Sequence, residues 1–78
     1  MQVKSSQINA NARTVTLNGK ELLFSYDTLV GVETGGSRYF QREDKAASVT
    51  TGRHISKWLA GRSASEVSAV KLQELAQV

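Results

Sequence analysis

The chain of 78 residues lacks cysteine and proline and has few aromatic residues, with one Trp, two Tyr and two Phe. Without cysteine it has neither a disulfide framework nor a thiolate metal site, and this composition fits a reducing cytoplasm. No stretch approaches the roughly 18 apolar residues of a membrane span, and the Met1–Ala12 segment is polar where a signal peptide is apolar. We therefore expect a soluble cytoplasmic protein with no membrane partner.

The length predicts one domain covering residues 1–78. A chain of this size buries only about 60–65% of the surface that its unfolded form exposes, so its core is thin. Association of two copies would supplement that core, and a homodimer is compatible with the sequence.

The charge is unevenly distributed, although the formal net charge is only +3. Six cations stand against two anions, Glu43 and Asp44, in the segment from 38 to 62. The rest of the chain has four cations and five anions, so the excess is +4 in the segment against −1 elsewhere. The six cations are Arg38, Arg42, Lys45, Arg53, Lys57 and Arg62. Such a segment favours phosphates or an acidic protein surface; the alternative is a solvated face that serves solubility alone.

The segment Val15–Phe24 contains two β-prone runs around Asn18-Gly19, the pair best suited to a two-residue hairpin turn. That turn places Leu17 opposite Lys20, Val15 opposite Leu22 and Arg13 opposite Phe24. One face then carries Val15, Leu17, Leu22, Phe24 and Tyr26, and we expect it to be the core side, with only Leu23 against the pattern.

A second hairpin is predicted from Leu29–Glu33 and Arg38–Arg42, with Gly35-Gly36 at the turn. This register pairs Val32 with Tyr39, Glu33 with Arg38, and Phe40 with Gly31, where an aromatic ring can cover the bare backbone. It puts Arg38, Phe40, Arg42 and Leu29 on one face, and Val30, Val32 and Tyr39 on the other.

Two helices follow a loop expected at Glu43–Ser48. The first, of about ten residues, has an apolar stripe of Ile55, Trp58 and Leu59, with Thr50 or Thr51 as N-cap and Gly61 just beyond its end. The second is predicted from a capping box of Ser63 and Glu66, with Val67, Val70 and Leu75 at helical spacing. The expected fold is α+β: a small antiparallel β-sheet of about four strands in two hairpins, followed by one or two packed α-helices.

The residues that could support catalysis are sparse. His54 is the only histidine, and the adjacent Glu43 and Asp44 need not point the same way, so no metal site is predicted. Ser25, Asp27 and His54 resemble a nucleophile, an acid and a base only on paper, because no nucleophile elbow is present. We expect a non-enzymatic protein with no catalytic residues, no metal and no cofactor.

Two segments allow a binding interpretation beside a structural one. At Thr50–His54, free helix N–H groups and Gly52 could receive an anion; alternatively the threonines cap the helix, Gly52 relieves crowding, and His54 bonds to the preceding loop. In Arg38–Arg42, Phe40 could stack on a base between arginine–phosphate contacts, or it could be buried under a helix with the arginines at its rim. Trp58 is expected in the core and Lys57 in solvent.

Two further motifs bring a family resemblance. Phe24–Val30 reads F-S-Y-x-T-x-V, and Ser48–His54 reads S-x-T-T-x-[KR]-H, followed by Trp58-Leu59. In these two motifs the chain resembles an uncharacterised family of small proteins from phages, prophages and plasmids. The resemblance spans about Thr14 to Leu59, leaving the first dozen residues and the tail from Gly61 outside. It implies a mobile-element origin, and many such proteins act stoichiometrically by binding host or defence machinery, including CRISPR effectors.

Together these observations predict an interaction protein that binds and inhibits a host or defence protein or ribonucleoprotein in the bacterial cytoplasm. The alternative is a small protein that binds RNA or DNA through the same basic surface. The expected contact residues are Arg38, Phe40, Arg42, Arg53, His54, Lys57 and Arg62.

Overall fold

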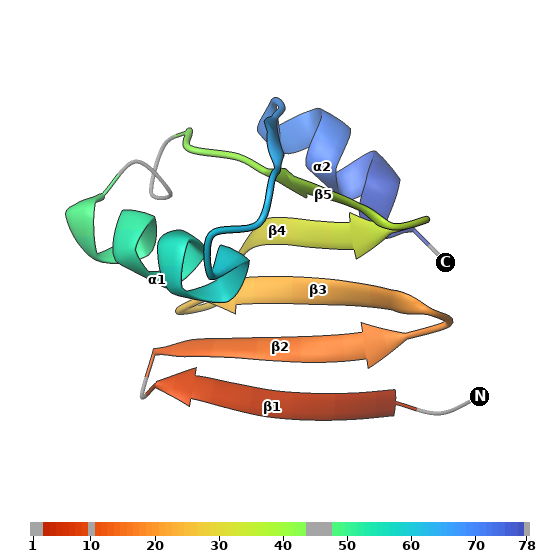
Figure 1. Ribbon diagram of the computed structural model, residues 1–78, viewed down its shortest axis with the longest axis horizontal. Coiled ribbons are helices and arrows are strands. Elements are labelled where there is room, and N and C mark those ends of the chain that lie inside the picture. The colour runs from red at the N-terminus through yellow and green to blue at the C-terminus, as the bar shows by residue number, and fades with distance from the viewer. Residues whose placement is uncertain (1–2, 10, 44–47, 78) are drawn as a thin grey trace.

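The computed structural model describes residues 3–9, 11–43 and 48–77, and the side chains of 11–43 and 48–77. A six-stranded sheet has the strand order β1-β2-β3-β4-β5-β6, and two helices lie against it (Figure 1). The elements are β1 (Val3–Asn9), β2 (Ala12–Leu17), β3 (Lys20–Ser25), β4 (Thr28–Thr34), β5 (Ser37–Phe40), α1 (Val49–Leu59), β6 (Ser65–Glu66) and α2 (Ala69–Ala76). The expected α+β class is confirmed. The edge strands β1 and β6 were not predicted, and the Asp44–Ala47 part of the expected loop, with Lys45, lies outside the described residues.

Both predicted hairpin registers are confirmed. β2 pairs with β3 through Leu17 and Lys20, and β4 pairs with β5 through Val32 and Tyr39. The turn residues have the positive φ angles that the sequence required: 52° at Asn18 and 79° at Gly19, then 60° at Gly35 and 81° at Gly36. Turn chemistry therefore fixed the register of each hairpin.

The deepest side chains of β2 and β3 lie on the face opposite to the predicted core face. Ala12, Thr14, Leu23 and Ser25 are buried, whereas Val15, Leu17, Leu22 and Phe24 are only partly buried, and Tyr26 is exposed. The prediction was wrong because it assigned the core by counting apolar residues. The buried face includes two small hydroxyl side chains, Thr14 and Ser25, and Ser25 lies within hydrogen-bond distance of two residues of α1.

α1 packs on that buried face. Ile55 and Trp58 form a cluster with Leu23 and Val30, and Phe40 and Leu59 pack against it. Trp58, rather than Phe40 alone, covers Gly31: a Cβ atom built at Gly31 would lie 2.7 Å from Trp58 Cζ3. A bulge between Leu23 and Phe24 shifts the register of β3 against β4, and Val30 joins this cluster rather than sharing the face of Val32 as predicted.

α2 packs against β4 on the other side of the sheet (Figure 1). Its Leu72 is 0% exposed, and Val32 of β4 is equally buried. Lys20 Nζ donates to the carbonyl oxygens of Leu75 and Gln77 at the end of α2, the first at 2.8 Å, which suits a cation at a helix C-terminus. The sheet is thus covered on both faces around β4.

Two details of the helices differ from the sequence prediction. Ser48, not Thr50 or Thr51, is the N-cap of α1, because its side chain accepts a hydrogen bond from the Thr51 N–H. The predicted capping box is absent: Glu66 belongs to β6, which pairs in parallel with β5, and Ser68 caps α2 instead.

Gly61 follows the end of α1 with φ of 84°, as predicted. Among the described helices, none has the length and apolar character that crossing a membrane requires.

Candidate functional site

The two motif segments meet in a buried polar cluster of Ser25, Thr51 and His54. Ser25 Oγ lies 2.7 Å from His54 Nδ1 and 2.9 Å from Thr51 Oγ1, within hydrogen-bond distance of both. Ser25 and Thr51 are each 2% exposed and His54 is 4% exposed. Buried polar groups need such partners, since an unpaired one costs about 1–3 kcal/mol. The cluster therefore fixes the first turns of α1 onto the end of β3.

This cluster contains two of the three residues, Ser25, Asp27 and His54, that were considered as a nucleophile, an acid and a base. Ser25 and His54 do come together, but Asp27 is exposed and lines a hollow with Gln41 and Gln73. The described contacts therefore assign His54 a structural hydrogen bond, made to the strand residue Ser25 rather than to the preceding loop. His54 is correspondingly removed from the exposed contact residues, which corrects the sequence prediction.

Tyr26 follows Ser25 in the two-residue turn between β3 and β4. Its φ is 56°, its side chain is 51% exposed, and its N–H donates to the Asn11 carbonyl at 2.6 Å. The Tyr26 and His54 rings lie with their centroids 6.0 Å apart and their planes tilted by 49°. An exposed aromatic ring is therefore held beside α1.

The outer side of α1 is exposed and cationic. We define the α1 surface as Arg42, Thr50, Arg53, Ser56 and Lys57, all of which are exposed. α1 itself contains no acidic residue, and Arg53 and Lys57 are four residues apart, which places them on the same side of the helix. Arg42 belongs to this surface because its Nη2 would lie 3.2 Å from a Cβ atom at Gly52, in the first half of α1.

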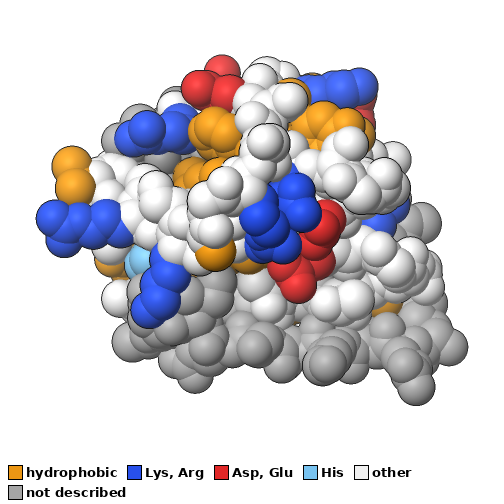
Figure 2. Space-filling view, viewed as in Figure 1, with side chains coloured by type: hydrophobic (Ala, Val, Ile, Leu, Met, Phe, Trp, Pro, Cys, Tyr) orange, Lys and Arg blue, Asp and Glu red, His pale blue; other side chains and the backbone are white. Residues whose placement is uncertain are grey.

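The cations of the α1 surface are free of carboxylate partners within the described part of the chain, where the one ion pair joins Arg38 and Glu33. Lys and Arg side chains appear on the face shown in Figure 2 as several separate groups, and one of these groups lies against acidic side chains. The cations of the basic segment are therefore spaced apart and do not form one continuous patch. Val49, at the start of α1, is 72% exposed.

Three other predicted contact residues have structural partners. Arg62 remains exposed, but its Nη2 and Nε donate to the carbonyls of Trp58 at 2.6 Å and Leu59 at 2.8 Å, which caps the end of α1. Arg38 Nε lies 3.5 Å from Glu33 Oε2, and its Nη1 donates to the Ser63 carbonyl at 3.5 Å. Phe40 is partly buried and packs against the α1 cluster, which fits the alternative in which this ring lies under a helix.

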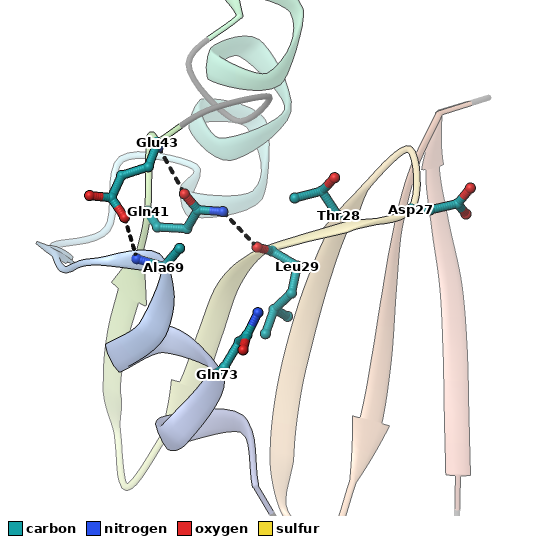
Figure 3. A pocket seen from close by; sticks show the side chains of 7 residues that line it. All are labelled: Asp27, Thr28, Leu29, Gln41, Glu43, Ala69 and Gln73. Carbon is teal, nitrogen blue, oxygen red and sulfur yellow. Dashed lines mark hydrogen bonds between the residues drawn. The ribbon is translucent and has the colours of Figure 1, made fainter.

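A hollow of about 540 Å³ lies between α2 and the start of β4 (Figure 3). Gln41 Nε2 donates to the Leu29 carbonyl at 3.0 Å, and its Oε1 accepts the Glu43 N–H at 2.8 Å. Glu43 Oε1 in turn accepts the Ala69 N–H at the start of α2 at 2.6 Å. These polar groups connect β4, the 41–43 segment and α2, which gives the lining a structural role. The hollow was not predicted, since its lining residues are distant in sequence.

Among the described residues, no group of three or more potential metal ligands occurs.

Fold and site together define a small α+β domain in which buried hydrogen bonds fix a cationic helix onto a sheet. The chain belongs to a family of unknown function, DUF8033, whose model matches residues 1–74. That match includes β1 and most of α2, whereas the motifs on which the resemblance was based lie within Thr14–Leu59. Neither a curated protein nor a solved structure gives a significant match.

Proposed function

We propose that this chain is a non-enzymatic accessory protein of a mobile element that binds a host or defence protein or ribonucleoprotein through the α1 surface. The exposure of Arg42, Arg53 and Lys57 on and beside one acid-free helix is the observation that supports the proposal most strongly. Bound in the bacterial cytoplasm, the protein would inhibit its partner by occluding an acidic site.

The rigid mounting of α1 supports a binding role. Ser48 caps its start, Ser25 holds Thr51 and His54, and Arg62 caps its end. A surface that is already ordered before binding loses little conformational entropy in the complex, so fewer contacts suffice for a given affinity. Charge on such a surface also accelerates encounter with an acidic partner and discriminates against basic ones.

The resemblance of the FSYDTLV and SVTTGRH motifs to small phage and plasmid proteins supports the mobile-element part of the proposal. In the structure, these motifs supply the buried cluster, and they contribute only Thr50 and Arg53 to the α1 surface. The motifs thus favour a shared way of holding α1, and the charges on α1 supply the surface that meets the partner.

The experiment is recovery of the tagged chain from a bacterial host, with and without nuclease, followed by mass spectrometry of the bound material. The proposal expects one host or defence component that is retained in stoichiometric amount after nuclease treatment. Recovery that disappears with nuclease would instead favour the second candidate, nucleic-acid binding, which the same cations support.

A further inference from the structure

Tyr26 occupies a backbone conformation that its side chain does not favour. Ser25 pairs with Thr28, which leaves Tyr26 and Asp27 as the turn between β3 and β4. The φ of 56° at Tyr26 lies in the left-handed region, where Gly, Asn and Asp meet less steric conflict than a bulky residue. Such strain persists only where neighbouring contacts impose it, and it is concentrated at functional positions.

The contacts that impose this conformation are present on both sides of the residue. The Tyr26 N–H donates to the Asn11 carbonyl at 2.6 Å, and Ser25, which precedes it, is fixed by His54 and Thr51. The ring itself is half exposed, so burial in the core does not account for an aromatic residue here. The turn presents a tyrosine ring to solvent from a fixed backbone.

The exposed ring borders the α1 surface. It contacts His54, whose neighbours at helical spacing are Thr50, four residues before, and Lys57, three residues after. Arg53 directly precedes His54 and is exposed. The Tyr26 ring therefore contacts a residue of α1 whose neighbours along the helix include two exposed cations, Arg53 and Lys57.

We propose that Tyr26, Arg53 and Lys57 form a contact site for single-stranded nucleic acid, in which an unpaired base stacks on the Tyr26 ring and phosphates contact the two cations. Aromatic rings beside basic residues are the usual means of binding single strands, because every base offers a face for stacking. A duplex keeps its base faces stacked inside, so it could use only the cations. This inference rests on the second candidate function, nucleic-acid binding, and deepens it by naming single strands as the ligand and the Tyr26 ring as the stacking surface.

The test is fluorescence anisotropy of the full chain with labelled oligo(U) and oligo(dT) of about 12 nucleotides, a length within the usual range for single-strand sites. Binding is expected at about 0.05 M salt and should weaken as salt is raised, because bound phosphates release counterions. Equal affinity for the two oligonucleotides indicates recognition of bases and phosphates alone; tighter binding of oligo(U) indicates an added contact to the 2′-hydroxyl.

Variants separate the ring from the charges. Tyr26→Phe retains stacking and should bind like the parent, whereas Tyr26→Gly should bind about 5- to 150-fold more weakly, the range expected for loss of one stacked base. Arg53→Gln with Lys57→Gln should reduce the slope of log K against log salt by about 1.4, since two phosphate contacts are lost. Lys71→Gln, an exposed cation on α2 across the sheet, is the matched control and should leave both quantities unchanged.

The proposal is overturned if neither oligonucleotide binds at low salt, or if Tyr26→Gly binds as tightly as Tyr26→Phe. Tyr26→Asn gives a second test, since asparagine accepts a positive φ without an aromatic ring. It should keep the Tm within about 4 °C of the parent and lose affinity like Tyr26→Gly. If a nuclease-resistant protein partner is found and no oligonucleotide binds, the proposed binding of a protein partner stands and this inference alone is contradicted. If an oligonucleotide binds and no such partner is found, this inference stands and the proposed binding of a protein partner is contradicted.

Discussion

Small buried polar side chains determine how α1 is held against the sheet. Ser25, Thr51 and His54 are buried together, and each hydrogen bond in the cluster replaces one that the unfolded chain makes to water. At this scale the sequence indicated which residues mattered but not their roles. Ser25 lies on the strand face that seemed polar, and its partner His54 is 29 positions away in the chain. Only the folded register brings the two together.

Ser25→Ala should lower the free energy of unfolding by about 1–3 kcal/mol, because His54 Nδ1 and Thr51 Oγ1 each lose a buried partner. Urea denaturation measures the change. Ser56→Ala removes a hydroxyl from the exposed side of the same helix and should stay within about 0.5 kcal/mol of the parent. Equal effects of the two substitutions would show that the cluster contributes nothing specific.

Gly31→Ala should be destabilising by about 1–3 kcal/mol, since the added methyl group would meet Trp58 Cζ3 at 2.7 Å and Leu23 Cβ at 3.1 Å. Trp58 is held in place by a 2.6 Å hydrogen bond from Nε1 to Glu21 Oε1, which limits how far the ring can move. In a Trp58→Ala background the same substitution should cost much less. A double-mutant cycle with no coupling energy would contradict the assigned packing.

At the scale of elements, the hairpins were the part most fully determined by local sequence. Asn18-Gly19 and Gly35-Gly36 admit the required positive φ angles, and each fixed a register that the structure confirms. The second helix was placed wrongly because Val67 and Val70 were taken as its apolar stripe. In the structure Leu72 carries the burial and Val70 is exposed. Because Leu72 is the one buried residue of this eight-residue helix, its apolar residues do not recur regularly enough to locate the helix from the sequence.

The N-cap of α1 provides a prediction that separates the structure from the sequence interpretation. Ser48→Ala should lower stability by about 1 kcal/mol, because the Thr51 N–H loses its 3.1 Å partner. Thr50→Ala, at one of the two positions expected from the sequence to cap the helix, should change stability by less than about 0.5 kcal/mol, since Thr50 is exposed. Thermal denaturation of the two variants decides the question, and the opposite order of Tm values would place the helix start at Thr50.

Over the whole molecule, the fold divides the expected contact residues into those that make contacts within the protein and those that remain exposed. Of the seven expected contact residues, His54 is buried, Phe40 is partly buried against the α1 cluster, Arg38 pairs with Glu33, and Arg62 caps α1. Arg42, Arg53 and Lys57 remain as exposed cations of the α1 surface. Composition predicted where the charge lies along the chain. It could not show which cations the fold uses for itself, because their carbonyl and carboxylate partners depend on tertiary structure.

The most direct test of a binding role for the α1 surface is quantitative capture by tagged Arg53→Glu with Lys57→Glu, compared with the parent and with Lys71→Glu. Each protein is first shown by circular dichroism to be folded, and the captured host component is measured by mass spectrometry after nuclease treatment. We predict that the double variant loses the component while Lys71→Glu retains it, because only the first reverses charge on α1. Undiminished capture by a folded double variant would contradict the account.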